Sequence, residues 1–413
     1  MALTVTDARL DGERVVIRCE GGTIAALGPA VAAEPGDEAI DAAGAHLVPP
    51  LVNGHTHAAM TLFRGSGGDL PLMPWLRERI WPVEAKLDED DVYWGARLAC
   101  AEMIRSGTTR FWDMYWQPGA TARAVEDSGI RAAIGAPLFD AAGSFEELRD
   151  SAHRSLEALA ETGPLVATSL APHAIYTVSE ESLRWIADLS AEQGLPVQIH
   201  LSETENEVQD CLAEHGERPA QYLDRLGLLS GRAILAHGVW LDPEELALVA
   251  ERGATVVANP VANMKLAVGG VFPYPAAKAV GAAIGLGTDG AGSNDSLDLL
   301  ADLKLFALTQ KHAAADPTAI DAAAAWAVAT GARAPLLGAT PLEPGAPADF
   351  LLLRPDAPEL GIGELASDLV YAAAGSVVDT TVVAGRVLMR GGEIEGLDEI
   401  VARAAERARR LGL

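Results

Sequence analysis

Five of the nine histidines in this 413-residue chain fall where a segment predicted to be a strand ends. His55 and His57 follow the first such segment, and His173, His200 and His237 close three later ones. Imidazole nitrogens are common metal ligands and common acid–base groups in catalysis. The placement of these side chains therefore predicts an active site at one end of a set of parallel strands.

A carboxylate joins these histidines in a pattern that suits a divalent metal. One residue separates His55 from His57, so on an extended chain both imidazoles point the same way. His200, His237 and Asp289 each end a later predicted strand. Three imidazoles and a carboxylate from this set suit Zn²⁺, and Fe²⁺ or Mn²⁺ accept the same ligand types. We therefore expect one divalent metal per chain, with zinc the first choice.

Eight apolar runs of strand length predict the strands that must carry these side chains. Helical patterns separate the runs, and this alternation predicts parallel strands joined by crossover helices. Eight such units favour a (β/α)8 barrel, in which the active site lies at the C-terminal ends of the strands. An open doubly wound sheet is the alternative, but no GxGxxG motif follows the first strand. The runs lie at 47–53, 108–113, 131–137, 165–171, 196–200, 232–237, 254–259 and 282–288.

Several helices carry start and stop signals. A capping Asp242 precedes Pro243 at the first helical position, Glu245 completes the capping box and Gly253 ends the helix. Thr177 is expected to cap another helix in the same way.

Segments that follow the strands are harder to assign. A helix is expected over 202–215, with Glu203 in its first turn. Residues 293–295 are expected to cap the helix after the last strand. The segment 259–270 is expected to be a loop that either closes over a substrate or satisfies backbone groups with its asparagines.

Both ends of the chain differ from this alternating pattern. Short apolar runs broken by turn residues predict strands within 1–46 and 347–395, and residues 396–412 predict a closing helix. We expect residues 1–48 and 345–413 to form a small β-sandwich beside a barrel of residues 49–344.

The amino-acid composition limits the classes of molecule that this chain is expected to bind. The chain has 58 acidic and 31 basic residues and a net charge of −27, so it repels phosphate backbones and anionic lipid headgroups. Its three cysteines form no CxxC motif, which disfavours a disulfide scaffold and favours a reducing compartment. We expect no secretory signal, no membrane span and no nucleic-acid partner, and we expect a cytoplasmic location.

Four motifs together resemble the amidohydrolase superfamily. They are HTH at 55–57, HLSET at 200–204, NPVANMKL at 259–266 and GTDGAGSND at 287–295. More narrowly they resemble its 5-methylthioadenosine/S-adenosylhomocysteine deaminase branch, to which the triazine chlorohydrolases are related. The resemblance covers essentially the whole chain.

The resemblance implies a role for each candidate metal ligand. His55, His57, His200 and Asp289 would bind one metal, and His237 would contact the metal-bound water or the reacting substituent. Asp289 would also accept a proton from the attacking water.

The resemblance implies substrate contacts as well. Glu203 would be the proton shuttle, Glu84 the ligand of the ribose hydroxyls and His173 a further substrate contact. Trp75 is expected either to wall the sugar or to pack on the barrel rim. No lysine lies between Lys86 and Lys265, so strand four cannot supply a bridging lysine and a single metal follows.

The implied reaction is hydrolytic deamination of a 5'-substituted adenosine to the inosine analogue and ammonia. Candidate small-molecule substrates are 5'-methylthioadenosine, S-adenosylhomocysteine, 5'-deoxyadenosine and adenosine, and a homo-oligomer is expected. After strand three no arginine aligns with confidence to hold the S-adenosylhomocysteine carboxylate, although Arg149 and Arg154 are candidates. Neutral 5'-groups are therefore expected to be preferred.

Two other functions stay open. One is deamination or dechlorination of a heterocycle without ribose, such as guanine, a pterin or a triazine, for which Glu84 would have no purpose. The other is an inactive amidohydrolase fold that serves as a binding module, which the complete set of ligands disfavours.

Overall fold

A closed barrel of parallel strands forms the centre of the computed structural model, which describes residues 2–66, 69–141 and 143–413. Its eight strands pair in the order β10-β8-β7-β6-β15-β14-β13-β12. The N–H of Leu170 donates to the carbonyl of Pro196, and the N–H of Gln198 donates to Leu170, which joins the two ends of this order. The strands are β6 (Leu51–Thr56), β7 (Thr108–Met114), β8 (Arg131–Gly135), β10 (Val166–Thr168), β12 (Val197–Leu201), β13 (Ala233–His237), β14 (Thr255–Ala258) and β15 (Ala283–Leu286).

The first barrel strand differs from the predicted run 47–53. β5 (His46–Val48) pairs with strands of the terminal sheet, whereas β6 enters the barrel. Pro49 and Pro50 lie between them, and a proline cannot donate to a sheet ladder. His55 consequently lies in β6 itself.

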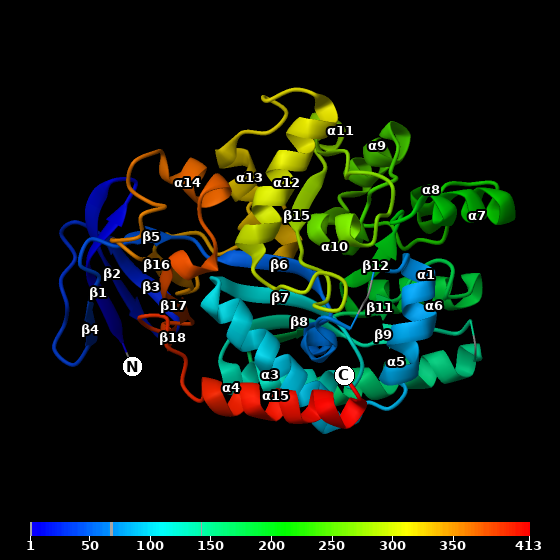
Figure 1. Cartoon of the computed structure of the whole chain (residues 1–413), viewed down its shortest axis with the longest axis horizontal. Coiled ribbons are helices and arrows are strands. Elements are labelled where there is room, and N and C mark those ends of the chain that lie inside the picture. The colour runs from blue at the N-terminus through cyan, green and yellow to red at the C-terminus, as the bar shows by residue number, and fades with distance from the viewer. Residues whose placement is uncertain (1, 67–68, 142) are drawn as a thin grey trace.

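Helices surround the barrel, as Figure 1 shows. Two very short strands, β9 (Pro137–Leu138) and β11 (Ala171–Pro172), extend its C-terminal edge. The helices of at least six residues are α3 (Glu89–Arg105), α4 (Pro118–Ser128), α5 (Phe145–Leu159), α6 (Glu180–Gln193), α7 (Glu205–His215), α8 (Pro219–Arg225), α9 (Pro243–Arg252), α10 (Pro260–Lys265), α11 (Tyr274–Ala279), α12 (Leu299–Ala314), α13 (Ala322–Ala329), α14 (Leu365–Tyr371) and α15 (Leu397–Leu411). Shorter helical segments are η1 (Ala58–Phe63), α1 (Leu72–Trp75), η2 (Leu76–Ile80), α2 (Trp81–Glu84), η3 (Pro335–Leu337) and η4 (Gly375–Val377).

The predicted signals of α9 are confirmed. Asp242 caps the helix, Pro243 is its first residue and Glu245 completes the capping box. Gly253 ends the helix with φ 70°, a left-handed conformation that glycine adopts without steric cost.

Two other predicted caps and one predicted helix start are wrong. Ser179, not Thr177, caps α6, because the Ser179 hydroxyl accepts from the N–H of Ser182. Thr204 caps α7, so Glu203 lies in the turn before that helix and not in its first turn. Asp298 caps α12, which leaves residues 293–295 free for another purpose.

Strands from both ends of the chain form one further sheet. Its order is β18-β17-β16-β5-β1-β2-β3, and β4 pairs with β1. Thr23 also pairs with Pro347, so the sheet folds back on itself around buried Ile17, Leu47 and Phe350. This arrangement confirms the predicted barrel with a small β-structure built from the two termini. The strands are β1 (Leu3–Leu10), β2 (Glu13–Glu20), β3 (Thr23–Gly28), β4 (Glu38–Asp41), β5, β16 (Phe350–Leu353), β17 (Val378–Val383) and β18 (Arg386–Met389).

The closing helix α15 returns to the barrel and lies beside α3 (Figure 1). Arg407 pairs with Asp90 at 2.7 Å, and Arg410 Nε donates to Asp91 Oδ1 at 3.0 Å. Ala404 of α15 is buried in the apolar cluster that includes Trp75. The end of the chain therefore braces the segment that covers the mouth of the barrel. No helix in the described part of the chain is long and apolar enough to cross a membrane.

Candidate active site

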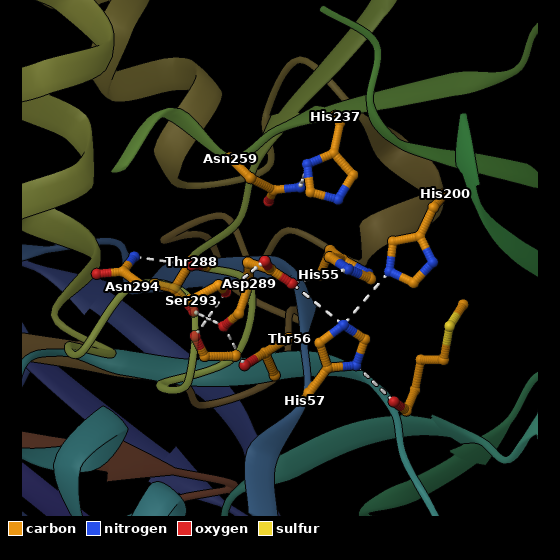
Figure 2. Close-up of polar contacts among 12 residues, drawn as sticks. His55, Thr56, His57, His200, His237, Asn259, Thr288, Asp289, Ser293 and Asn294 are labelled. Carbon is orange, nitrogen blue, oxygen red and sulfur yellow. Dashed lines mark hydrogen bonds and ion pairs between the residues drawn. The ribbon is translucent and has the colours of Figure 1, made fainter. Parts of the chain in front are cut away.

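Four histidines and one aspartate converge at the C-terminal ends of the barrel strands (Figure 2). One donor atom from each of His55, His200, His237 and Asp289 lies within 4.8 Å of the others. His57 meets the same group, because its Nε2 lies 3.1 Å from Asp289 Oδ1 and 3.3 Å from His200 Nε2. The structure thus brings together the four histidines and the aspartate that the sequence predicts as metal-site residues. His237 belongs to this cluster as closely as the four ligands that the resemblance implies.

Backbone carbonyls orient two of the rings. His57 Nδ1 lies 2.6 Å from the carbonyl oxygen of Met114, and His200 Nδ1 lies 2.7 Å from that of His173. A carbonyl oxygen only accepts, so each Nδ1 carries the proton and each Nε2 keeps its lone pair. Both lone pairs are therefore available to one central ion, as outer hydrogen bonds commonly arrange for metal-binding histidines.

A side chain orients the third ring. His237 Nδ1 lies 2.8 Å from Asn263 Oδ1, so the amide oxygen fixes the same tautomer. His237 also has φ 75°, a left-handed conformation that is costly for a residue with a Cβ. Asn263 belongs to α10, so the predicted loop 259–270 is helical in its first half.

Asp289 is held with one oxygen free. Its Oδ2 accepts from the hydroxyl of Ser293 at 2.5 Å, and its backbone carbonyl accepts from Thr56 Oγ1 at 2.8 Å. Its φ is 61°, so this residue too is held in the left-handed region. Oδ1 is left to face His55 and His57, at 3.5 and 3.1 Å from their Nε2 atoms.

Buried polar atoms without hydrogen-bond partners indicate whether a metal fits this site. His55 is fully buried, and neither of its ring nitrogens has a hydrogen-bond partner. Asp289 Oδ1 is buried and has none either. Buried polar atoms without partners are costly unless an ion or water satisfies them. Nitrogen donors with one carboxylate oxygen are the ligands that Zn²⁺ prefers, so the residues present fit a divalent metal.

Close packing also shapes this centre. Gly287 precedes the Thr288-Asp289 pair, and a Cβ there would contact the Asn259 side chain and come within 2.8 Å of the His55 carbonyl oxygen. Only glycine leaves room for the strand end that carries Asp289 to approach β6.

Glu203 lies in the turn between β12 and α7 and faces the same centre. Its side chain is almost fully buried, and Oε2 lies 3.8 Å from His237 Nε2. Burial raises the pKa of Glu203, the Asp289 carboxylate adds to the rise, and the His237 ring opposes it. Burial therefore favours the protonated form of this carboxyl.

Glu84 ends α2 and lines the same cavity. Burial raises the pKa of its carboxyl, and hydrogen bonds from the Tyr115 and Trp116 side chains oppose the rise. The Tyr115 hydroxyl is buried beside this carboxyl. A carboxylate at the wall of a cavity can accept hydrogen bonds from a polar ligand and position it.

His173 follows β11 and lies beside the cluster of histidines and Asp289. Its Nδ1 is 2.9 Å from Thr177 Oγ1, and that hydroxyl donates to the carbonyl of Ala174. Thr177 therefore accepts from Nδ1, which leaves Nε2 of His173 as an acceptor. Burial and the neighbouring histidines lower the pKa of His173 to about 3, so its ring is neutral.

A cavity of about 70 Å³ connects these groups. Its aromatic wall contains Trp116 stacked on Phe139 at 5.5 Å and Phe139 stacked on His173 at 4.5 Å between ring centroids. Trp75, which is 5% exposed, also lines the cavity and packs in the apolar cluster that contains Met60 and Phe63. Its contact with a sugar stays a prediction.

Two larger chambers adjoin this cavity. One, of about 600 Å³, shares Glu84 and its aromatic neighbours with the cavity, and no lysine or arginine is among its lining residues. The other, of about 730 Å³, has Arg77 beside three carboxylates, those of Glu205, Glu207 and Asp210.

The two arginines suggested by the sequence line neither chamber. Arg149 lies over the ring of Phe145 at 5.7 Å. Arg154 lines another cavity against α4, which shares Trp116 and Pro137 with the central cavity.

The sequence also matches the model of the amidohydrolase family over residues 46–388. The chain belongs to the amidohydrolase family. This confirms the resemblance seen in the motifs.

Amidohydrolases with deaminase names are similar to this chain over nearly their whole length. The 5'-deoxyadenosine deaminase of Methanoregula boonei is 48% identical over 380 residues, which cover 90% of this chain and 86% of the relative. The 5-methylthioadenosine/S-adenosylhomocysteine deaminase 1 of Archaeoglobus fulgidus is 40% identical over 402 residues, which cover 96% and 94%. An adenosine deaminase from Xanthomonas campestris, solved with bound zinc, is 34% identical with a TM-score of 0.92 and covers 100% of this chain and 98% of its own.

Sequence reasoning missed the supporting residues of this amidohydrolase site. Ser293 was expected to cap a helix and instead holds Asp289. Asn263 was expected either to lie in a loop that closes over a substrate or to satisfy backbone groups, and instead it holds His237. Asn263 lies five residues after the end of β14, and Ser293 lies seven residues after the end of β15. A polar residue in the segment after a barrel strand was the available signal.

Proposed function

We propose that this amidohydrolase catalyses the hydrolytic deamination of 5'-substituted adenosines to the inosine analogue and ammonia. The observation that carries the proposal is the buried Glu203 carboxyl, 3.8 Å from His237 and facing the same cavity as the histidine–aspartate cluster. Deamination of a purine needs a proton donor for the ring and a nucleophile on one face of it. The names of the relatives support this reaction class.

We propose zinc as the metal and His55, His57, His200 and Asp289 as its ligands. The bound zinc of the similar adenosine deaminase and the nitrogen-rich donor set support zinc over iron or manganese. When bound, a divalent metal makes water nucleophilic near neutral pH. His237 then orients the attacking oxygen and the developing tetrahedral centre at C6 of the adenine.

Two carboxyl groups move the protons. The Asp289 carboxylate accepts the proton that the attacking water loses as its oxygen bonds to C6. Glu203 donates a proton to N1 as the ring takes up electrons, and burial favours the protonated form that this role requires. The C6–N6 bond then breaks, and the amino group leaves as ammonia with the proton that Asp289 held. The C6 hydroxyl gives its proton back to Glu203 as the C6=O bond forms, which restores the proton donor.

The opposite side of the cavity binds the sugar. Glu84 accepts hydrogen bonds from the two ribose hydroxyls, and His173 Nε2 accepts one from the substrate. Trp75 walls the cavity beside them. A carboxylate placed for two vicinal hydroxyls favours nucleosides over guanine, pterins or triazines, which have no ribose.

The chambers favour a neutral 5'-group. Among the described residues, the chamber beside Glu84 is lined by no cationic side chain, and the other is lined by Arg77 together with Glu205, Glu207 and Asp210. The carboxylate of S-adenosylhomocysteine would lose water in the chamber beside Glu84 without gaining a cationic partner. We therefore propose that 5'-deoxyadenosine and 5'-methylthioadenosine are better substrates than S-adenosylhomocysteine.

We further propose that the enzyme acts on free nucleosides in the cytoplasm as a homo-oligomer. Its net charge of −27 opposes binding to nucleic acid. Its three cysteines are buried and unpaired, which suits a reducing compartment.

Ultraviolet absorbance and ammonia release test the proposal. The zinc-loaded enzyme should convert the adenine spectrum of 5'-methylthioadenosine to that of the hypoxanthine with one ammonia per turnover. Glu203→Gln should lower turnover by orders of magnitude and keep its zinc. Glu84→Ala should lose nucleoside activity alone. Deamination of guanine or a pterin by the wild type, with none of nucleosides, would favour the alternative function.

A further inference from the structure

The turn that carries Glu203 is held by a second buried glutamate. Glu207 Oε1 accepts from the N–H of Ser202 at 2.8 Å, and its Oε2 accepts from the N–H of Glu203 at 2.9 Å. Glu207 is only 6% exposed. One carboxylate therefore binds two consecutive backbone amides, and one of them belongs to the residue proposed as the proton donor.

Ordinary helix capping does not require this arrangement. In a capping box the glutamate at the third helical position reaches back to the N–H of the cap residue. Thr204 is the cap of α7, and its hydroxyl already accepts from the N–H of Glu207. The Glu207 carboxylate passes beyond the cap to the two residues before it.

The turn needs such a support because its backbone is strained. Ser202 has φ 51°, in the left-handed region that residues with a Cβ rarely occupy. Its carbonyl accepts from the N–H of Trp240 at 2.9 Å, and its amide is held only by Glu207. Such strain persists where surrounding contacts over-determine it, and it commonly sits at functional sites.

We propose that Glu207 is a positioning residue that holds the backbone of Glu203 so that its carboxyl faces the substrate ring. This inference rests on the proposed function of Glu203 as proton donor. Without the two hydrogen bonds, the turn can relax from its left-handed conformation and the Glu203 carboxyl moves relative to the ring nitrogen. A shift of about 1 Å at a catalytic group can cost about 100-fold in rate.

The test is Glu207→Gln in the zinc-loaded enzyme. The glutamine keeps one acceptor, but its amide group faces the second backbone N–H, so one of the two hydrogen bonds is lost. We expect kcat to fall about 10- to 100-fold, with KM changed less than about threefold and zinc content unchanged. Glu207→Asp, one methylene shorter, retains the charge and gives a second variant with the same expectation.

Glu245 provides a matched control. It is fully buried and its Oε1 accepts from the N–H of Ala220 at 2.9 Å, but it lies on α9, away from the cavity lining. Glu245→Gln should lower the midpoint of thermal unfolding and leave kcat unchanged. An equal loss of kcat in this control would overturn the positioning role of Glu207 in favour of general structural support.

A double variant separates this inference from the proposed function. If Glu207 acts through Glu203, then Glu203→Gln combined with Glu207→Gln should be no slower than Glu203→Gln alone. A double variant slower by the full factor of Glu207→Gln would overturn the inference, as would a kcat of Glu207→Gln within twofold of wild type. If Glu203→Gln alone retained normal turnover, the proposed function of Glu203 would fail first.

Discussion

The hydroxyl of Ser293 donates to Asp289 Oδ2 at 2.5 Å, and this bond decides which oxygen of the aspartate faces the histidines. Oδ1 lies 3.1 Å from His57 Nε2 and has no hydrogen bond of its own. A carboxylate with both oxygens free can rotate about its last torsion. Ser293 removes that freedom and presents one oxygen to the metal centre.

We therefore expect Ser293→Ala to weaken zinc binding about 10- to 100-fold, the usual cost of losing an outer-layer contact. Competition for zinc against a coloured chelator measures this directly. Ser190→Ala is the control, because Ser190 is also buried and its hydroxyl also donates, to the Leu195 carbonyl at 2.7 Å, but on the remote helix α6. Unchanged zinc affinity in Ser293→Ala would show that Asp289 is held by the backbone alone.

Asn263 gives a second prediction through the tautomer of His237. Asn263→Leu removes the acceptor of the Nδ1 proton, so the ring can turn or protonate at Nε2, and kcat should fall at least about tenfold with little change in KM. Asn263→Asp still accepts the proton and should retain more activity than Asn263→Leu. Equal activity of the two variants would contradict the role of the amide oxygen. Steady-state kinetics on 5'-methylthioadenosine decides between these outcomes.

The sequence was informative where one side chain determines one local feature. The apolar runs placed His55 and His200 on the barrel, and the Asp242-Pro243 pair with Gly253 located α9 to the residue. It was uninformative where competing side chains offer the same hydrogen bond. Thr177 and Ser179 can both cap a helix, and only the packed structure assigns Thr177 to His173 and Ser179 to α6.

The left-handed backbone conformations at the strand ends could not be predicted from the sequence either. Ser202, His237 and Asp289 all have a positive φ, although none is a glycine. Local propensity argues against that conformation, and side chains from other segments hold these residues, as Asn263 of α10 holds His237 and Ser293 holds Asp289. Sequence reasoning therefore found the residues that face the proposed metal position and missed those that hold them.

Gly287 offers a prediction about packing. Gly287→Ala places a methyl group against the Asn259 side chain and 2.8 Å from the His55 carbonyl, closer than carbon and oxygen approach in folded proteins. We expect a lower thermal midpoint together with loss of zinc, because both β6 and the Asp289 turn must shift. Gly119→Ala is the control, since a Cβ there meets Ala158 at an ordinary 3.5 Å. Equal zinc content in the two variants would contradict the predicted displacement.

The terminal sheet gives a prediction about pH. Arg18 Nε donates to Asp37 Oδ2 at 2.9 Å, and Thr4 Oγ1 donates to the same oxygen at 2.7 Å. These bonds, with that from the Glu34 N–H, hold the pKa of Asp37 well below its usual value near 4. A depressed pKa in the folded state stabilises the fold above the unfolded pKa, and this contribution is lost as the pH falls toward the folded pKa.

Asp37→Asn should therefore lower the midpoint of thermal unfolding at pH 7, and the difference from wild type should shrink steadily below about pH 4. Differential scanning calorimetry across this pH range measures both the difference in midpoint at pH 7 and its decrease at lower pH. Asp11→Asn is the control, because Asp11 lies exposed in the neighbouring turn between β1 and β2. A difference that stayed constant down to pH 3 would mean that Asp37 contributes through shape and not through its charge. Asp37 directly precedes β4 of the terminal sheet, whereas the proposed zinc ligands lie at the ends of the barrel strands. The kcat of Asp37→Asn at pH 7 and 25 °C should therefore equal that of wild type, so the loss of stability can be assigned to the terminal sheet alone.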